Sequence, residues 1–110
     1  MDCDMEYEVQ YSNQSSYDLD AIFEFLENNS GTDVAKKIVD EIMDKADSLY
    51  FMPGGYNFDE RLKRRLNKDY PTQAVVYKKY IILFIVKEKE KIVYVTNVIS
   101  SRSDYLRLMK

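Results

Sequence analysis

The sequence predicts an α+β fold, a two-layer sandwich with a helical hairpin packed on one face of a mainly antiparallel sheet. Three runs of β-branched and aromatic residues lie between positions 74 and 99, and such residues fit the pleated surface of paired strands. Two stretches with apolar residues at helical spacing, 17–26 and 35–49, precede them. A short alternating segment, 7–11, starts the pattern. The expected order is β-α-α-β-β-β, with a short helical tail at the C-terminus.

A polar break separates the first strand from the first helix. Tyr7, Val9 and Tyr11 alternate with polar residues, which indicates a strand with one buried face. Ser15 and Asp18 have the spacing of a capping box, with Asp in place of the usual Glu. We expect Asp18 to face solvent. The apolar positions of the helix recur at spacings of three and four and are Leu19, Ile22, Phe23 and Leu26.

A second helix carries apolar residues on one side and charged residues on the other. It ends before 53–55, a Pro-Gly-Gly sequence that does not continue a helix. Because only a short break at 28–31 separates the helices, we expect an antiparallel hairpin whose apolar stripes bury together against the sheet. The second stripe comprises Ala35, Ile38, Val39, Ile42, Ala46 and Leu49.

The last three runs indicate consecutive antiparallel strands. The middle run, 80–86, is apolar at every position, so it should be the central strand with both faces covered. Lys78 and Lys79 precede it, and a charged turn at 87–91 follows it. Neither lysine favours a positive φ, so we expect a longer or bulged connection in place of a two-residue turn.

Length and composition indicate a single cytoplasmic domain. The chain has 110 residues and no stretch that approaches the ~18 apolar residues of a membrane span. Its first residues are acidic and lack the apolar core of a secretory signal. A single cysteine, Cys3, cannot form an internal disulfide, which fits a reducing cytosol. We expect a flexible extension at 1–4 and one domain over 5–110.

Two features of the composition limit the chemistry. The sequence contains no histidine, so acid–base catalysis would fall to Asp, Glu, Lys, Tyr or Arg, and zinc sites of the His/Cys type are excluded. The formal net charge is −3, which argues against a generic nucleic-acid-binding protein. We predict no metal site and no cofactor.

The segment 56–72 is the least regular part of the pattern, and it holds the densest basic cluster of the chain. One interpretation is a solvated loop with a helical turn or a short edge strand. The other is a patch that contacts phosphate groups, and both stay open. The cluster consists of Arg61, Lys63, Arg64, Arg65 and Lys68.

Four segments match, in order, the motifs of one known family. Residues 17–26 (YDLDAIFEFL) are similar to a D-L-x-x-I-x-x-Y-L helix, and 49–54 (LYFMPG) to a helix end L-x-x-x-P-x-x-G. Residues 80–84 (YIILF) resemble a Y-x-I-x-Y/F strand, and 98–105 (VISSRSDY) a closing V-x-H-x-R-R-D-Y. Over nearly its whole length from Met5, the chain therefore resembles the RelE/ParE toxins of bacterial type II toxin–antitoxin modules.

The resemblance implies one of two activities. Some members of the family cleave messenger RNA on the ribosome, and others inhibit DNA gyrase without acting as nucleases. This chain has Gln73, Ile85, Ser100 and Ser103 where basic, tyrosine or histidine side chains are frequent in the family. The absence of these side chains favours a gyrase-type or uncharacterised target. A ribosome-dependent mRNA endoribonuclease and an inactive, protein-binding relative remain the alternatives.

The resemblance and the basic cluster together give the expected site residues. For a nuclease, Lys63 or Lys68 is the candidate base, and Tyr105 would donate a proton. The charge of the phosphorane would be stabilised by Arg61, Arg64, Arg65 or Arg102. An ion pair of Arg102 with Asp104, and packing of Tyr105 on the last strand, are the structural alternatives. The wider surface for the target or for nucleic acid comprises Arg61, Lys63, Arg64, Arg65, Lys68, Arg102 and Asp104.

A cognate antitoxin is the partner that the resemblance implies. Two helices can cover only one face of the sheet, yet 80–86 is apolar on both faces. We therefore expect part of this strand to remain as an exposed apolar patch, on which an antitoxin segment folds as it binds. Self-association through the patch is the alternative. The residues expected to contact the antitoxin are Tyr80, Ile82, Phe84 and Leu106.

Overall fold

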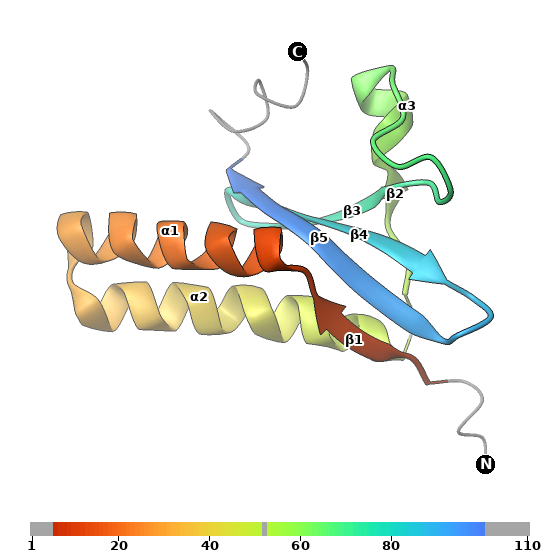
Figure 1. The fold of residues 1–110 in the computed structure, drawn as a ribbon. Coiled ribbons are helices and arrows are strands. Elements are labelled where there is room, and N and C mark those ends of the chain that lie inside the picture. Colours follow the sequence, from red (N-terminus) through yellow and green to blue (C-terminus); the bar gives the residue numbers. More distant parts are fainter. Residues whose placement is uncertain (1–5, 52, 101–110) are drawn as a thin grey trace.

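The computed structural model describes residues 6–51 and 53–100, and it shows an open five-stranded sheet with a helical hairpin on one face (Figure 1). The strand order is β1-β5-β4-β3-β2, and every neighbouring pair is antiparallel except β1 with β5. The predicted α+β fold and the central position of 80–86 are confirmed. The elements are β1 (Glu8–Tyr11), α1 (Asn13–Ser30), α2 (Thr32–Asp47), the 3₁₀ helix η2 (Ser48–Tyr50), β2 (Tyr56–Asn57), α3 (Phe58–Leu62), β3 (Gln73–Tyr77), β4 (Tyr80–Lys87) and β5 (Ile92–Ser100).

Two sequence predictions lie outside the described residues, the extension at 1–4 and the C-terminal helical tail. The segment 56–72 contains the short edge strand β2 and the short helix α3, which agrees with the expected loop with a helical turn or a short edge strand. None of the helices in the described parts of the chain has the length and apolar character needed to cross a membrane.

The start of α1 is fixed by Ser12, one turn earlier than the predicted cap. The Ser12 hydroxyl accepts a hydrogen bond from the Ser15 amide (3.0 Å) and donates one to the Thr96 carbonyl of β5 (2.9 Å). It therefore satisfies an orphan donor of the helix and also ties the helix to the sheet.

Asp18 has a structural role that the sequence pattern did not indicate. One oxygen of its carboxylate accepts a hydrogen bond from the Val98 amide of β5 (2.9 Å), so Asp18 does not simply face solvent as expected. The strand β1 pairs with β5 only over 92–95. Asp18 thus satisfies a backbone donor of β5 in the part of the strand that β1 does not reach.

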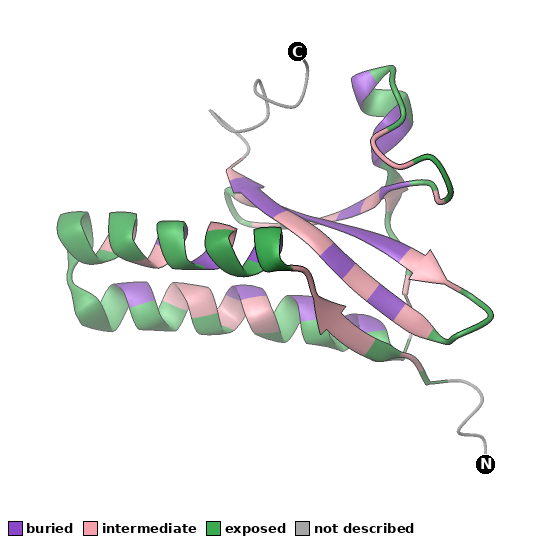
Figure 2. Ribbon diagram, in the orientation of Figure 1, coloured by how far each residue is buried: buried purple, intermediate pink, exposed green. Residues whose placement is uncertain are grey.

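The main core lies between the hairpin and the sheet, where the residues of the predicted helical stripes are buried or half-buried. Figure 2 shows the outer sides of α1 and α2 exposed and the buried positions turned toward the sheet. Burial of each Leu, Ile or Val side chain in this core stabilises the fold by about 1.5–3 kcal/mol. The helices contribute Leu19, Ile22, Ile42 and Ala46, and the sheet contributes Ile82, Val95 and Val98.

The second face of the sheet is also covered around β4, which corrects the expected exposed patch. Ile81, Leu83 and Ile85 are only 6%, 0% and 3% exposed. Phe58 and Leu62 pack there, together with Ala74, Ile81, Leu83 and Ile99. These two residues stand four apart in α3 and so share one side of that helix, a short signal that the loop interpretation of 56–72 overlooked.

A glycine allows β2 to lie against β3. Tyr56 pairs with Ala74 at the edge of the sheet. A Cβ atom at Gly55 would lie 2.3 Å from the Ala74 carbonyl oxygen, whereas one at Gly54 would meet nothing within 4 Å. The close approach at Gly55 therefore requires the absence of a side chain.

The connection from β3 to β4 is a two-residue turn, so the expectation of a longer or bulged connection is wrong. Tyr77 pairs directly with Tyr80, and Lys78 takes the positive φ of 53°. Contacts with α2 stabilise this turn. The Tyr77 hydroxyl donates a hydrogen bond to the Glu41 carboxylate, and the Lys78 Nζ lies 3.6 Å from the same group. The Tyr77 hydrogen bond is the main cause of a lowered Glu41 pKa.

Candidate functional site

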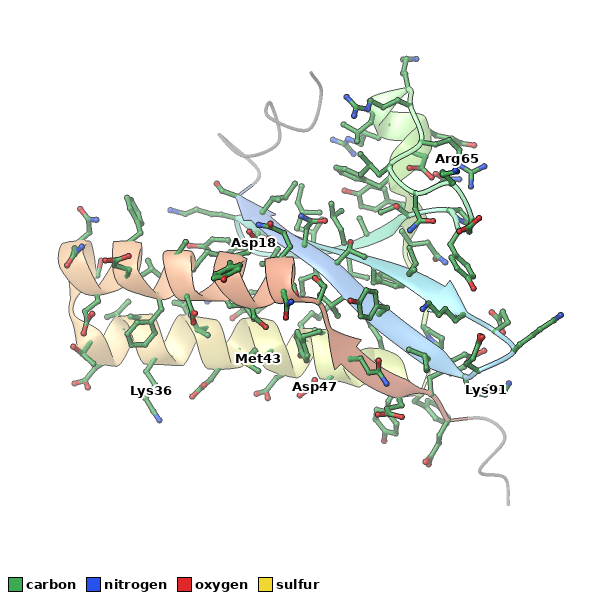
Figure 3. All side chains as sticks on the ribbon, in the orientation of Figure 1. Asp18, Lys36, Met43, Asp47, Arg65 and Lys91 are labelled. Carbon is green, nitrogen blue, oxygen red and sulfur yellow. The ribbon has the colours of Figure 1, made fainter. Side chains whose placement is uncertain are left out.

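The predicted basic residues come together on one lobe, formed by β2, α3 and the loop 63–72. Figure 3 shows Arg65 on this lobe, well apart from the hairpin that bears Lys36, Met43 and Asp47. Each of the clustered cations is exposed: Arg61, Lys63, Arg64, Arg65 and Lys68.

Both ends of α3 are capped, which positions the cations that follow. The Asn57 side chain accepts a hydrogen bond from the Glu60 amide (3.1 Å) at the start of the helix. At the other end, Lys63 adopts a left-handed conformation with φ 62°, and its amide donates to the Asp59 carbonyl. Asn57 and Glu60 have the spacing of a capping box, so this helix start was readable in the sequence.

Asp59 organises the basic loop from inside the lobe. Its side chain is buried, and the two carboxylate oxygens accept hydrogen bonds from the amides of Leu66 (3.2 Å) and Thr72 (3.0 Å). The Thr72 carbonyl in turn accepts from the Phe58 amide (2.9 Å). The loop 63–72 is therefore closed on α3 by a buried anion, which holds the exposed cations on a defined backbone.

The cations of the lobe offer positive charge to an anionic partner. The Arg61 guanidinium lies over the Tyr56 ring, 5.6 Å from its centroid. Arg65 Nε is 4.0 Å from the Asp59 carboxylate, and its side chain remains 59% exposed. A shallow cavity of about 270 Å³ opens beside these groups, lined by Asn57, Asp59, Glu60, Arg64, Arg65 and Pro71.

A second basic feature, which the sequence did not reveal, lies at the far end of β4. Lys87 Nζ stands 5.9 Å from the ring centroid of Tyr70 and 5.3 Å from that of Tyr94. Tyr70 comes from the lobe and Tyr94 from β5, so the lysine joins the two parts through cation–π contacts. A cavity of about 500 Å³ adjoins, lined by Tyr70, Pro71, Gln73, Val86, Glu88, Lys89 and Glu90.

Charge is divided between the two ends of the molecule. The hairpin and its end, 13–50, hold nine acidic and three basic residues. The lobe, 56–72, holds five basic and three acidic residues, and one of those acids is the buried Asp59. A polyanion would therefore be attracted to the lobe and repelled by the hairpin.

Only part of the predicted site can be placed. Lys63 and Arg65 share the lobe, whereas Arg102, Asp104, Tyr105 and Leu106 lie outside the described residues. Within 6–51 and 53–100, no group of three or more His, Cys, Asp or Glu side chains could hold a metal ion.

The predicted antitoxin contacts on β4 need correction. Ile82 and Phe84 are 0% exposed because they face the helical hairpin and its end, so they offer no surface to a partner. Tyr80 is half-buried at the edge of the same core, and burial raises the pKa of its hydroxyl. Among the residues that the structure describes, the two most exposed large apolar side chains are Tyr17 (70%) and Phe25 (64%) on α1.

Comparisons with known proteins show which family and which solved structures this chain resembles. The family model described as the ParE toxin of the type II toxin–antitoxin system parDE matches residues 9–105. The chromosomal ParDE system from P. aeruginosa has a similar structure, with a TM-score of 0.68 and 18% identity over 88% of this chain and 97% of that one.

The toxin–antitoxin complex RelBE2 from Mycobacterium tuberculosis is also similar, with a TM-score of 0.58 and 15% identity over 87% of this chain and 92% of that one. A search of curated proteins gives no match. The family match spans most of the chain, and the chain therefore belongs to the ParE toxins of type II toxin–antitoxin systems.

Proposed function

We propose that this toxin arrests bacterial growth through a gyrase-type target in the cytoplasm, without cutting RNA, and that a cognate antitoxin neutralises it. The observation that carries the proposal is the exposed basic lobe held on the buried Asp59. The lobe presents exposed positive charge on a backbone that the hydrogen bonds of Asp59 fix, and such a surface suits a target that includes DNA or an acidic protein surface.

The same lobe fits RNA cleavage poorly. Cleavage through a 2′-hydroxyl needs a base within hydrogen-bond reach of that hydroxyl. A lysine acts as a general base only as the neutral amine, and removal from water is one way to favour that form. Lys63 and Lys68 are exposed to water. Asp59 is occupied by two backbone amides. Arg102, Asp104 and Tyr105 stay in the proposed target surface on the strength of the family motif alone.

An mRNA endoribonuclease is the second candidate. The observation that favours it is Lys87 between Tyr70 and Tyr94, because aromatic rings beside a cation suit the stacking of unpaired bases. In that case the catalytic set would be Lys63, Arg65, Arg102 and Tyr105.

Inducible expression tests the proposal at the level of toxicity. The natural chain should arrest growth, and co-expression of the neighbouring gene should restore it. The quadruple variant R61A/K63A/R64A/R65A should lose toxicity but remain folded, because exposed substitutions usually cost within about 0.5 kcal/mol each, or at most about 2 kcal/mol for the four. The matched control removes three exposed lysines of α2 (K36A/K37A/K45A) and should remain toxic. Full toxicity of the quadruple variant would remove the lobe from the target site.

A further inference from the structure

Tyr70 is held in place at the wall of a cavity, although it does not belong to a hydrophobic core. Its amide and that of Asp69 donate hydrogen bonds to the Asn67 side-chain oxygen (3.1 and 2.8 Å). The nearby amide of Thr72 is bound by the buried carboxylate of the lobe. Lys87 Nζ lies 5.9 Å from the centroid of the Tyr70 ring. The ring is therefore positioned by its backbone and by a cation, and none of the hydrophobic clusters of the described residues includes it.

The cavity beside Tyr70 has the size and the walls of a ligand site. Its volume of about 500 Å³ lies within the ~300–1,000 Å³ of typical ligand pockets. The Tyr70 ring, Pro71 and Val86 form apolar walls, which suit the face of a planar ring. Polar side chains, which can form hydrogen bonds with the edge of such a ring, complete the lining and are Gln73, Glu88, Lys89 and Glu90.

Cations of the basic lobe lie next to this cavity. Pro71 lines it and also lines the smaller cavity of about 270 Å³ that holds Arg64 and Arg65, so the two cavities adjoin. A ligand that reaches both cavities would place a flat ring against Tyr70 and a negative charge against the two arginines. A nucleic-acid strand has both groups in each unit, a base and a phosphate.

We propose that the Tyr70 cavity binds an unpaired base of single-stranded DNA, with a neighbouring phosphate against Arg64 and Arg65. A paired base is stacked within its duplex and does not offer its face to a tyrosine. The proposal rests on the proposed function above, because it takes the target of the basic lobe to be DNA and not an acidic protein surface.

The acidic side chains of the cavity predict which base it selects. Glu88 and Glu90 can accept hydrogen bonds, and cytosine has an exocyclic amino group where thymine has a carbonyl oxygen. The same carboxylates repel a phosphate, so they favour a base over the DNA backbone inside the cavity. The natural chain should therefore bind oligo(dC) at least about threefold more tightly than oligo(dT). Equal affinities for the two strands would overturn a base held in this cavity.

Fluorescence anisotropy with the purified toxin and labelled strands of about 12 nucleotides tests the role of the ring. Tyr70→Ala should weaken the Kd for oligo(dC) at least about fivefold, the effect of losing one stacked base. Tyr70→Phe should stay within about twofold of the natural chain, because stacking needs only the ring. The matched control, Tyr17→Ala, removes an exposed ring from α1 and should also stay within about twofold, because the acidic hairpin repels a polyanion.

Amide hydrogen exchange separates stacking from closure of the loop. Tyr70→Ala should keep natural protection at the amides of Leu66 and Thr72, because Asp59 still binds both. The loss of affinity then belongs to the ring. The preference for oligo(dC) is measured on the natural chain, so it tests the cavity even where a variant alters the loop.

Duplex DNA and RNA test the choice of ligand. The Kd for duplex DNA should not change in Tyr70→Ala, and a loss as large as that for oligo(dC) would contradict an unpaired base. Tighter binding of oligo(rC) than of oligo(dC) would contradict DNA as the ligand and favour the endoribonuclease. The cavity fails if the natural chain does not bind oligo(dC), or if Tyr70→Ala binds it equally well. The proposed function fails separately, if the natural chain leaves supercoiling by gyrase unimpaired.

Discussion

Replacement of Asp59 by alanine removes the anion that closes the basic lobe without changing any cation. The amides of Leu66 and Thr72 lose their acceptors. Thr72 is only 2% exposed, so its amide cannot turn to water, whereas Leu66 is half-buried and can recover part of the loss. We expect the loop 63–72 to detach from α3, so that its exposed cations no longer hold fixed positions.

The cost can be worked from these contacts. A hydrogen bond to a charged group is worth about 1.5–3 kcal/mol, and we expect about 2–4 kcal/mol for the pair once the partial exposure of Leu66 is counted. The Arg65 side chain adds little, because at 4.0 Å and 59% exposure its attraction to Asp59 is screened by water.

Amide hydrogen exchange measures the effect directly. Asp59→Ala should lose protection at the amides of Leu66 and Thr72 and should reduce toxicity, while β4 and β5 keep their protection. The control is Glu60→Ala, because Glu60 is exposed and only its backbone amide takes part in the helix cap. Natural protection at both amides in Asp59→Ala would refute a lobe organised by the buried carboxylate.

Three further changes test the fold. Gly55→Ala should destabilise by about 1–3 kcal/mol through the clash with the Ala74 carbonyl, and urea unfolding should show no such loss for Gly54→Ala. Asp18→Ala should cost about 1–3 kcal/mol by leaving the Val98 amide unpaired, and Asp20→Ala, at an exposed position, should cost within about 0.5 kcal/mol. Burial, aided by the Asp47 acceptor, raises the pKa of the Tyr11 hydroxyl above its ordinary 10.0, so unfolding at rising pH should show stability lost above pH 10 in the natural chain and a smaller loss in Tyr11→Phe.

The long periodic segments were predictable from the sequence. Two helical stripes, an alternating first strand and a fully apolar central strand each bury enough apolar surface to determine their own structure. Prediction from the sequence failed where a single hydrogen bond or a short element determines the local structure. Asp18 reads as a surface acid, and only the register of β5 gives it an amide to bind. The Lys78 turn forms despite a poor turn sequence, because Tyr77 and Lys78 are held by Glu41.

The sequence predicted which basic residues lie together, but it did not predict how their side chains are arranged in space. The basic residues of 56–72 are adjacent in the sequence, so their joint position on one lobe needed no long-range information. Lys87 meets Tyr70 and Tyr94 only through the sheet register. The antitoxin contacts predicted on β4 were wrong because Ile82 and Phe84 face the helical hairpin and its end. Phe58 and Leu62, two apolar residues in an irregular segment, cover the opposite face of the sheet, which two helices alone would leave open.

The most direct test of the proposed function compares two activities of the purified toxin. One arm measures DNA supercoiling by gyrase, and the other sequences transcript ends after translation on ribosomes. We expect loss of supercoiling at toxin concentrations that produce no new transcript ends, with the cognate antitoxin restoring gyrase and R61A/K63A/R64A/R65A inactive. Cleaved transcripts together with unimpaired supercoiling would contradict a gyrase-type target and establish the endoribonuclease instead.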